Sequence, residues 1–258
     1  MTRMHKSRGM VWGICLFLLG SANLLAEDHR VYELRVYYAA PGKLEALNAR
    51  FRDHTVKLFE KHGIVNIGYW VPVDNPDNKL IYVLAYPSAE ARATSWKAFS
   101  DDPAWQQAKK ASEVSGRLVA KVEAKLMSAT DYSPPVQVTA PGNRVFEMRT
   151  YTATKGNLGL LNARFRDHTV KLFEKHGMTN VVYWNLLPSE EGADRTLIYI
   201  LSHASQDAAK ASFGAFRTDP AWLAARQASE EKGGGSLTEA QGGVVSVFMT
   251  PTDYSPMK

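Results

Sequence analysis

The sequence of 258 residues predicts an α+β fold made of two tandem ferredoxin-like βαββαβ repeats. Three observations predict this fold. A segment of seventeen residues, 47–63, recurs unchanged at 161–177. Shorter matches occur in the same order in both halves, such as 102–105 with 219–222. The spacing between matches grows only in turn-like and glycine-rich segments, which is typical of two copies of one domain with insertions in loops.

The first part of each repeat is predicted from its hydrophobic patterning. In the first copy, alternating side chains predict a strand over 29–38. Apolar residues at helical spacing then predict a helix over 43–62, with Gly63 at its C-terminal end. Two strand-like segments, 65–73 and 79–86, are separated by residues that strongly favour a turn.

The second part of each repeat is predicted to contain two helices and a strand. Ser88 is a suitable cap for a helix that extends to Phe99, and Asp102 is a suitable cap for a helix that ends near Gly116. Alternation over 118–126 predicts a half-buried strand. Such a unit forms a four-stranded antiparallel sheet with helices on one face. Two copies can cover each other's second sheet face by packing sheet against sheet.

Residues 1–26 are predicted to be a secretory signal peptide. Three basic residues precede the apolar run 10–19, and small residues follow it. The run has about half of the roughly 20 residues that span a bilayer. We expect cleavage after Ala26, with Ala22 as a second cleavage site and an uncleaved signal anchor as the alternative. The mature protein is therefore expected to be periplasmic or extracellular, with no membrane attachment.

Removal of the signal peptide changes the charge of the protein. The full chain has 31 basic and 26 acidic residues and a formal charge of +5, and three basic residues leave with the signal. The remaining charge of about +2 gives no electrostatic support for nucleic-acid binding. Cys15, the only cysteine, is also removed, so the mature protein is expected to have no disulfide and no thiolate site.

The order and spacing of several short segments resemble the NIPSNAP family. In the first repeat, at 29–132, these segments are 32–37, 41–43, 59–63, 68–70 and 102–105. The second repeat, at 144–256, keeps most of them and departs at Lys155-Gly156 and Val182, and the linker 133–143 is rich in proline. The resemblance implies the dimeric α+β barrel fold, which we expect to be closed within one chain.

The resemblance implies little about activity, because the biochemical role of the family is poorly defined. Cofactor-independent monooxygenases and haem-degrading enzymes also use the superfamily fold, which is an analogy of fold alone. The preferred hypothesis is a binding module for a small, partly apolar ligand. The alternatives are a cofactor-independent monooxygenase or haem-handling enzyme, and a protein-interaction scaffold that uses the charged helix. A homodimer is compatible with each of them.

The unchanged helix segment keeps charged residues that packing does not require. The six charged positions identical in both copies are Arg50, Arg52, Asp53, Lys57, Glu60 and Lys61. They indicate either a functional surface or a recent duplication with a solvated face. His54 and its copy His168 lie beside the apolar stripe, so each is a candidate acid, base or haem ligand, or a packing residue.

The first strand of each repeat carries a polar face. Glu33, Arg35 and Tyr37 recur as Glu147, Arg149 and Tyr151. If two sheets face each other, these six groups are expected to line the interface, either as a site for a polar or anionic ligand or as a buried ion-pair network.

The candidate walls of an apolar pocket are Trp70 with its copy Trp184, Tyr69, Tyr82 and Trp105, with core packing as the alternative. The sequence contains no glycine-rich phosphate loop, G-x-S-x-G or H-E-x-x-H pattern. His54 and His62 are not spaced as paired helical ligands, so no metal and no other cofactor is expected.

Overall fold

The two halves of the chain have the same order of elements. The first half contains β1 (Val31–Ala39), α1 (Leu44–Arg50), η1 (Phe51–Thr55), α2 (Val56–Lys61), β2 (Val65–Pro72), β3 (Lys79–Tyr86), α3 (Ala89–Asp101), α4 (Pro103–Ser112) and β4 (Val119–Ala129). The second half contains β5 (Val145–Thr152), α5 (Leu158–Arg164), η2 (Phe165–Thr169), α6 (Val170–Lys175), β6 (Thr179–Leu186), β7 (Thr196–His203), α7 (Gln206–Thr218), α8 (Pro220–Gly233) and β8 (Val244–Pro251). The two βαββαβ repeats are therefore confirmed.

The computed structural model describes residues 1–2, 28–137 and 144–258. All but the first two residues of the predicted signal peptide lie outside the described residues, as does most of the predicted linker. None of the helices in the described ranges is long and apolar enough to cross a membrane.

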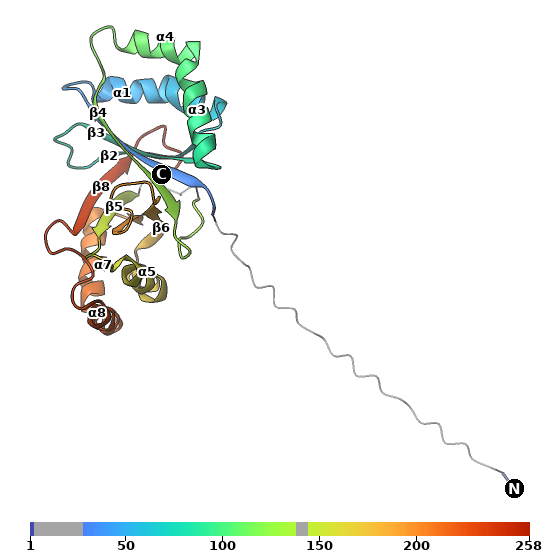
Figure 1. Ribbon diagram of the computed structural model, residues 1–258, viewed down its shortest axis with the longest axis vertical. Helices are drawn as coiled ribbons and strands as arrows, with labels where there is room; N and C mark the ends of the chain where they lie inside the picture. The colour runs from blue at the N-terminus through green and yellow to red at the C-terminus, as the bar shows by residue number, and fades with distance from the viewer. Residues whose placement is uncertain (3–27, 138–143) are drawn as a thin grey trace.

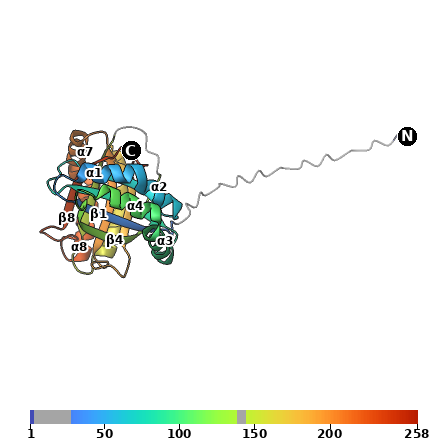
Figure 2. The same cartoon turned by 90° about the horizontal axis from the view of Figure 1, so that it is seen from above.

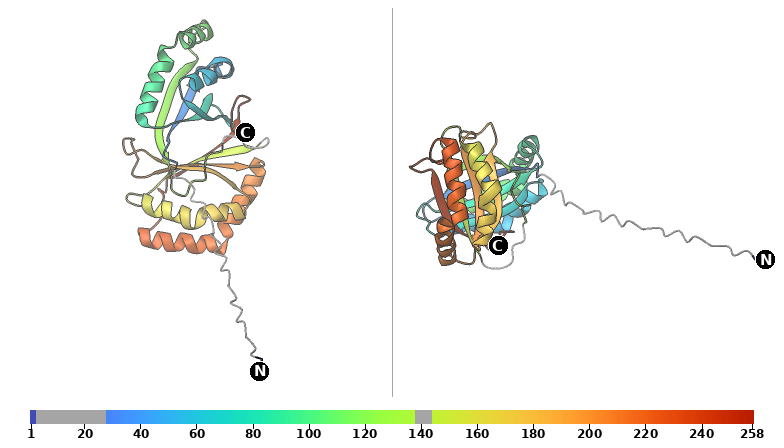
Figure 3. Two further views of the ribbon diagram at one scale, coloured as in Figure 1. Left: turned by 90° about the vertical axis from the view of Figure 1, so that its right-hand side faces the viewer. Right: turned by 90° about the horizontal axis from the view of Figure 1, so that it is seen from below.

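The eight strands close into one antiparallel barrel, in the order β1-β3-β2-β8-β5-β7-β6-β4. Each half supplies four strands, and the halves join where β2 pairs with β8 and β4 pairs with β6. Helices of the two halves lie on opposite outer sides of the barrel (Figures 1 and 3). The barrel is thus closed within one chain, as expected from the resemblance and from the need to cover the second sheet face.

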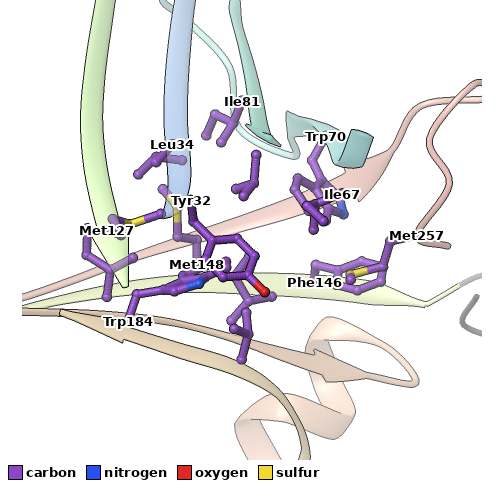
Figure 4. Close-up of a cluster of buried hydrophobic side chains, with 14 of the residues drawn as sticks. Tyr32, Leu34, Ile67, Trp70, Ile81, Met127, Phe146, Met148, Trp184 and Met257 are labelled. Atoms are coloured by element: carbon purple, nitrogen blue, oxygen red, sulfur yellow. The ribbon is translucent and has the colours of Figure 1, made fainter. Parts of the chain in front are cut away.

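The interior of the barrel is apolar and carries contributions from both halves (Figure 4). Tyr32 packs against Trp184 with 5.4 Å between ring centroids, and Trp70 packs against Phe146 at 5.6 Å. These four side chains are almost fully buried. Trp70 and Trp184 therefore belong to the core of the barrel, which was the alternative to their role as pocket walls.

The polar face of β1 lies against the helices, and the expectation that it lines the interface between the sheets is wrong. Tyr32 and Leu34 point into the barrel, whereas Glu33 contacts α3. Successive side chains of a strand point to opposite faces. The large apolar residues therefore face the barrel interior and the polar residues face the helices, which is the reverse of the expected arrangement. The same holds for β5, where Phe146 and Met148 belong to the barrel interior.

The helix predicted over 43–62 is interrupted by one π-helical turn, η1, and the second half repeats this as η2. Phe51 and Thr55 of this turn are buried, and the Thr55 hydroxyl donates to the carbonyl oxygen of Arg50 at 3.1 Å. Thr169 makes the same bond to Arg164. The buried face of the turn contacts the sheet, since Phe51 packs on Tyr82 of β3 at 5.2 Å. π-Helical turns are frequent at functional sites.

Two other expectations about the elements had different outcomes. The predicted caps are confirmed: Ser88 Oγ accepts from the Ala91 amide, and Asp102 Oδ1 accepts from the Ala104 amide. Strand β4 is not half-buried throughout, because residues 120–125 are exposed. Only 127–129 of β4 pair with β6, so its first part is an open edge of the barrel. Its lysines and glutamate disfavour pairing with another chain there.

Candidate functional site

A cavity of about 400 Å³ lies between the sheet and the helices of the first half. Figure 2 looks onto these helices, with β1 and β4 beneath them. The aromatic side chains that line it are Tyr37, Phe51, Phe59, Trp96, Phe99 and Trp105. The volume falls in the range of roughly 300–1000 Å³ that is usual for small-molecule sites.

The aromatic walls come from five elements (β1, η1, α2, α3 and α4) that are held together by ring contacts. Phe59 and Phe99 pack at 4.7 Å between centroids, and Phe99 and Trp105 at 4.5 Å. Tyr37 contacts Phe51 edge-on at 5.9 Å, so the strand and the π-helical turn meet at the cavity. Such packing makes the walls rigid, because each ring is fixed by its neighbours.

The cavity also carries several cations. Arg50 is buried inside it, with Nη1 2.9 Å from Glu113 Oε1 and its guanidinium 5.2 Å from the centroid of Trp105. Three exposed cations, Lys109, Arg117 and Lys121, also line the cavity. Arg50 is therefore a buried, positively charged hydrogen-bond donor inside the cavity. The other three side chains form a cationic mouth.

Arg35 lies behind one wall and fixes two lining residues. Its guanidinium stacks on Trp96 at 4.4 Å, and Nη2 donates to the Tyr37 hydroxyl at 3.4 Å. Its Nη1 donates to Glu33 Oε1 at 2.5 Å. The predicted trio of β1 is thus brought together, but of the three only Tyr37 lines the cavity.

Glu33 is the centre of a buried network that includes α3. Arg92 contacts both of its oxygens, at 2.6 and 3.0 Å, and Trp96 Nε1 and the Tyr86 hydroxyl each donate at 2.9 Å. Burial raises the pKa of Glu33, but the Arg92 hydrogen bond and the charge of Arg35 outweigh it and hold the pKa below its ordinary value. Glu33 therefore remains charged and positions Trp96.

The second half keeps the strand trio but changes its partners. Glu147 accepts from Arg149 at 2.5 Å, from His203 at 3.1 Å and from Ser246 at 2.5 Å. His203 occupies the place of Tyr86, since each pairs with the first residue of the neighbouring strand. The counterparts of Arg92 and Trp96 on α7 are the smaller Ala209 and Phe213. Tyr151 packs against Phe165, as Tyr37 does against Phe51.

The histidine candidates lie away from the cavity. His54 and His168 are exposed on their π-helical turns, and neither lines the cavity of the first half. His54 therefore faces away from the space between helix and sheet and is not a packing residue, because Phe51 and Thr55 take that face of the turn. No cluster of three or more metal-ligating side chains occurs in the described residues.

Several cavity residues were not identified from the sequence as site residues. Trp96 lines the cavity and Arg92 lies four residues before it on the same helix, outside the lining, and the sequence pattern pointed to neither. Arg50 was predicted only as one charge of a surface. A usable signal was present in the two copies themselves. Arg92, Trp96 and Arg117 all lie where the copies differ, in a chain whose segment 47–63 is identical in both copies.

Known proteins resemble this chain in sequence and in fold. The sequence model of the NIPSNAP family matches residues 32–134 and 146–256. No curated protein matches the chain. A solved NIPSNAP family protein from Agrobacterium tumefaciens is 25% identical, and the alignment covers 41% of this chain and 98% of that one, with a TM-score of 0.38.

Two further solved structures align with both halves of the chain. A candidate monooxygenase from Fusobacterium nucleatum is 8% identical, covers 87% of this chain and 93% of its own, and has a TM-score of 0.54. An anthrone oxidase-like protein is 13% identical, covers 90% of this chain and 95% of its own, and has a TM-score of 0.55. At these identities the likeness concerns the barrel fold alone.

Proposed function

The chain belongs to the NIPSNAP family in both of its halves, and from this premise we propose that it binds a small, partly apolar molecule in the cavity of its first half. The observation that carries the proposal is the aromatic lining around a buried arginine, Arg50. Apolar walls supply affinity by burying ligand surface, and a few fixed polar groups orient the ligand. The Glu33 network supports this role because it fixes Trp96 in one position.

The test uses N-phenyl-1-naphthylamine, an uncharged dye that fluoresces when it enters an apolar site. Val122 lines the cavity and lies opposite Tyr37, and Val244 lies opposite Tyr151 at the matching place in the second half. Both valines are 43% exposed, so either position accepts a larger side chain. We expect saturable binding that Val122→Trp reduces at least about tenfold, because the indole fills the cavity, with no change for Val244→Trp.

Thermal melting of both variants checks that they remain folded. Binding that is unchanged by Val122→Trp, or reduced equally by Val244→Trp, would contradict a site in the first half.

We also propose that the protein acts after export to the periplasm or the outside of the cell. The support is the N-terminal sequence, with its basic residues, apolar run and Ala26. N-terminal sequencing of protein recovered from the exported fraction is expected to begin at Glu27. Recovery of the uncleaved chain with membranes would contradict this.

A second candidate function is that of a cofactor-independent monooxygenase or haem-handling enzyme. Its support is the barrel shared with a candidate monooxygenase and an anthrone oxidase-like protein. The two histidines considered for it, His54 and His168, do not fit a haem in the cavity, because both are exposed outside it. Haem titration followed by absorbance separates the haem-handling enzyme from the cofactor-independent monooxygenase. A Soret shift that His54→Ala abolishes would favour the haem-handling enzyme.

The scaffold hypothesis receives less support from the charged helix. Arg52 and Arg166 are engaged within the chain, with Asp253 and Asp131 of the opposite half at 2.6 Å. A partner protein would have to compete with these contacts.

A further inference from the structure

We infer that the ligand of the first-half cavity is an amphipathic organic anion, such as a carboxylate with an aromatic or aliphatic body. Each chain is inferred to bind one molecule of this ligand. This inference rests on the proposed function and names its class of ligand. The acidic group would lie between Arg50 and the cationic mouth formed by Lys109, Arg117 and Lys121. The apolar body would lie against Trp96 and the neighbouring rings.

The charge of the lining favours an anion. Four cationic side chains line the cavity, against one lining carboxylate, Glu113. One of the four, Lys121, is paired with Glu123 outside the lining at 2.5 Å, so the excess of positive charge rests mainly on Arg50, Lys109 and Arg117. Arg50 is the important one, because its side chain is only 4% exposed and a buried cation is stable only when an anion compensates it. Glu113 is 20% exposed and contacts one nitrogen of the guanidinium, so it compensates Arg50 in part. A ligand carboxylate would complete the compensation with charge-assisted hydrogen bonds.

The second half supports the inference because it keeps the inner part of this site and lacks its mouth. Arg164 lies 5.2 Å from the centroid of Trp222, the same distance as Arg50 from Trp105. The segment that joins α4 to β4 contains Arg117, whereas the matching segment after α8 reads Gly234-Gly235-Ser236.

The other two mouth cations also differ between the halves. Ala120 and Lys121 are replaced by residues 239–243, which contain one glutamate and no cation. Arg226 replaces Lys109 and is paired with Glu230 at 3.0 Å. The second half therefore keeps a cation at the place of Lys109 but lacks those at the places of Arg117 and Lys121, while the buried arginine and the tryptophan are kept. Such a pattern is expected if one half binds the anion and the other half completes the barrel.

The test compares two fluorescent probes that share an aromatic body. These are 8-anilinonaphthalene-1-sulfonate, which is an anion, and N-phenyl-1-naphthylamine, which lacks the sulfonate. We expect the anion to bind at one site per chain, at least about tenfold more tightly than the neutral probe, at low salt. Excitation of tryptophan is expected to transfer energy to either probe, because Trp96 and Trp105 line the cavity.

The decisive variant combines Lys109→Glu, Arg117→Glu and Lys121→Glu, which reverses the charge of the mouth without touching its aromatic walls. We expect it to weaken binding of the anion at least about tenfold and to change binding of the neutral probe less than about twofold. The matched control combines Arg217→Glu, Arg226→Glu and Lys232→Glu, three exposed cations of the second half. The control changes the net charge equally and is expected to leave both probes unaffected.

The outcomes separate the inference from the proposed function. If both probes bind with equal affinity, or if the mouth and control variants behave alike, the anionic ligand class is wrong and the small-molecule site stands. If neither probe binds, or if Val122→Trp leaves both unchanged, the proposed function fails and the inference fails with it. Displacement of the anion by decanoate but not by decanol would extend the result from sulfonate to carboxylate.

Discussion

At the scale of single residues, the most consequential group is Glu33, which has no exposed surface and holds β1 to α3. It compensates two arginines, Arg35 and Arg92, whereas Glu147 in the second half compensates only Arg149. A buried carboxylate is costly by itself but is favourable when its donors are already in place. Four side chains donate to Glu33, so its charge is well compensated.

Glu33→Gln is expected to lower the free energy of unfolding by about 3 kcal/mol, because two partly buried guanidinium groups lose their counter-charge. Glu147→Gln is expected to cost less, since it leaves a single arginine uncompensated. Urea denaturation of both variants measures the difference. Equal losses of unfolding free energy in the two variants would show that Arg92, the second arginine partner of Glu33, adds nothing to stability.

The same carboxylates predict how stability depends on pH. Burial raises the pKa of Glu33 and Glu147, but hydrogen bonds and arginine charges outweigh it, so both pKa values lie below the ordinary value. Hydrogen bonds from Lys61 and His62 lower the pKa of Asp102, and the matching residues lower that of Asp219. A group with a lowered pKa binds fewer protons when folded, so acid favours the unfolded state.

We therefore expect the melting temperature to be level between about pH 7 and pH 5 and to fall below about pH 4.3, the ordinary glutamate value. The loss continues as the pH falls through the lowered pKa values of the folded protein. Circular dichroism melts across this range measure it. Glu33→Gln should flatten the acid limb, and an identical limb in that variant would contradict the assignment.

At the scale of elements, the two halves hold each other through exchanged terminal segments. Tyr254, which follows β8, donates to Asn48 at 2.7 Å and stacks on Phe51 of the first half. Tyr132, which follows β4, donates to Asn162 of the second half at 2.8 Å. Each tyrosine follows an aspartate that contacts an arginine of the same opposite helix.

This exchange explains part of the unchanged helix segment. In each copy, one asparagine and one arginine contact the same Thr-Asp-Tyr-Ser-Pro sequence from the other half. These pairs are Asn48 with Arg52 and Asn162 with Arg166. Two identical partners preserve two identical helix faces. Nothing in the structure explains why Asp53 and Lys57 are also identical.

The exchanged segment is expected to be held mainly by its aromatic ring. Tyr254→Ala should lower the free energy of unfolding by about 3 kcal/mol, because it removes buried contacts with Phe51 and Tyr69. Asp253→Ala should cost at most about 1 kcal/mol, because both partners of its ion pair with Arg52 are over a third exposed. Urea denaturation of the two variants ranks them, and the reverse order would mean that charge holds the segment.

At the scale of the whole molecule, closure of the barrel depends on both halves. The sheet of the first half presents Tyr32, Leu34, Ile81 and Val83 to the second half, and all four are buried in the closed barrel. A single half would leave this apolar face in water, which favours association.

A chain of residues 28–137 is therefore expected to form a dimer, with a second copy in the place of the second half. The matched contacts Tyr32–Trp184 and Trp70–Phe146 would both be replaced by a contact between Tyr32 of one copy and Trp70 of the other. Sedimentation velocity over a range of concentrations measures the state of association. A folded, stable monomer would contradict the view that each sheet needs the other.

The sequence by itself determined the repeats, the order of elements, the helix caps and the need for a second sheet. These follow from local patterns and from self-similarity, which a single chain displays directly. The tertiary structure decided which face of β1 meets the helices, because alternation gives two faces but does not say which is inward when both carry large side chains. It also decided the site. The cavity joins Tyr37, Arg50 and Trp96 from three separate elements with Arg117 from a loop, and only packing brings these residues together.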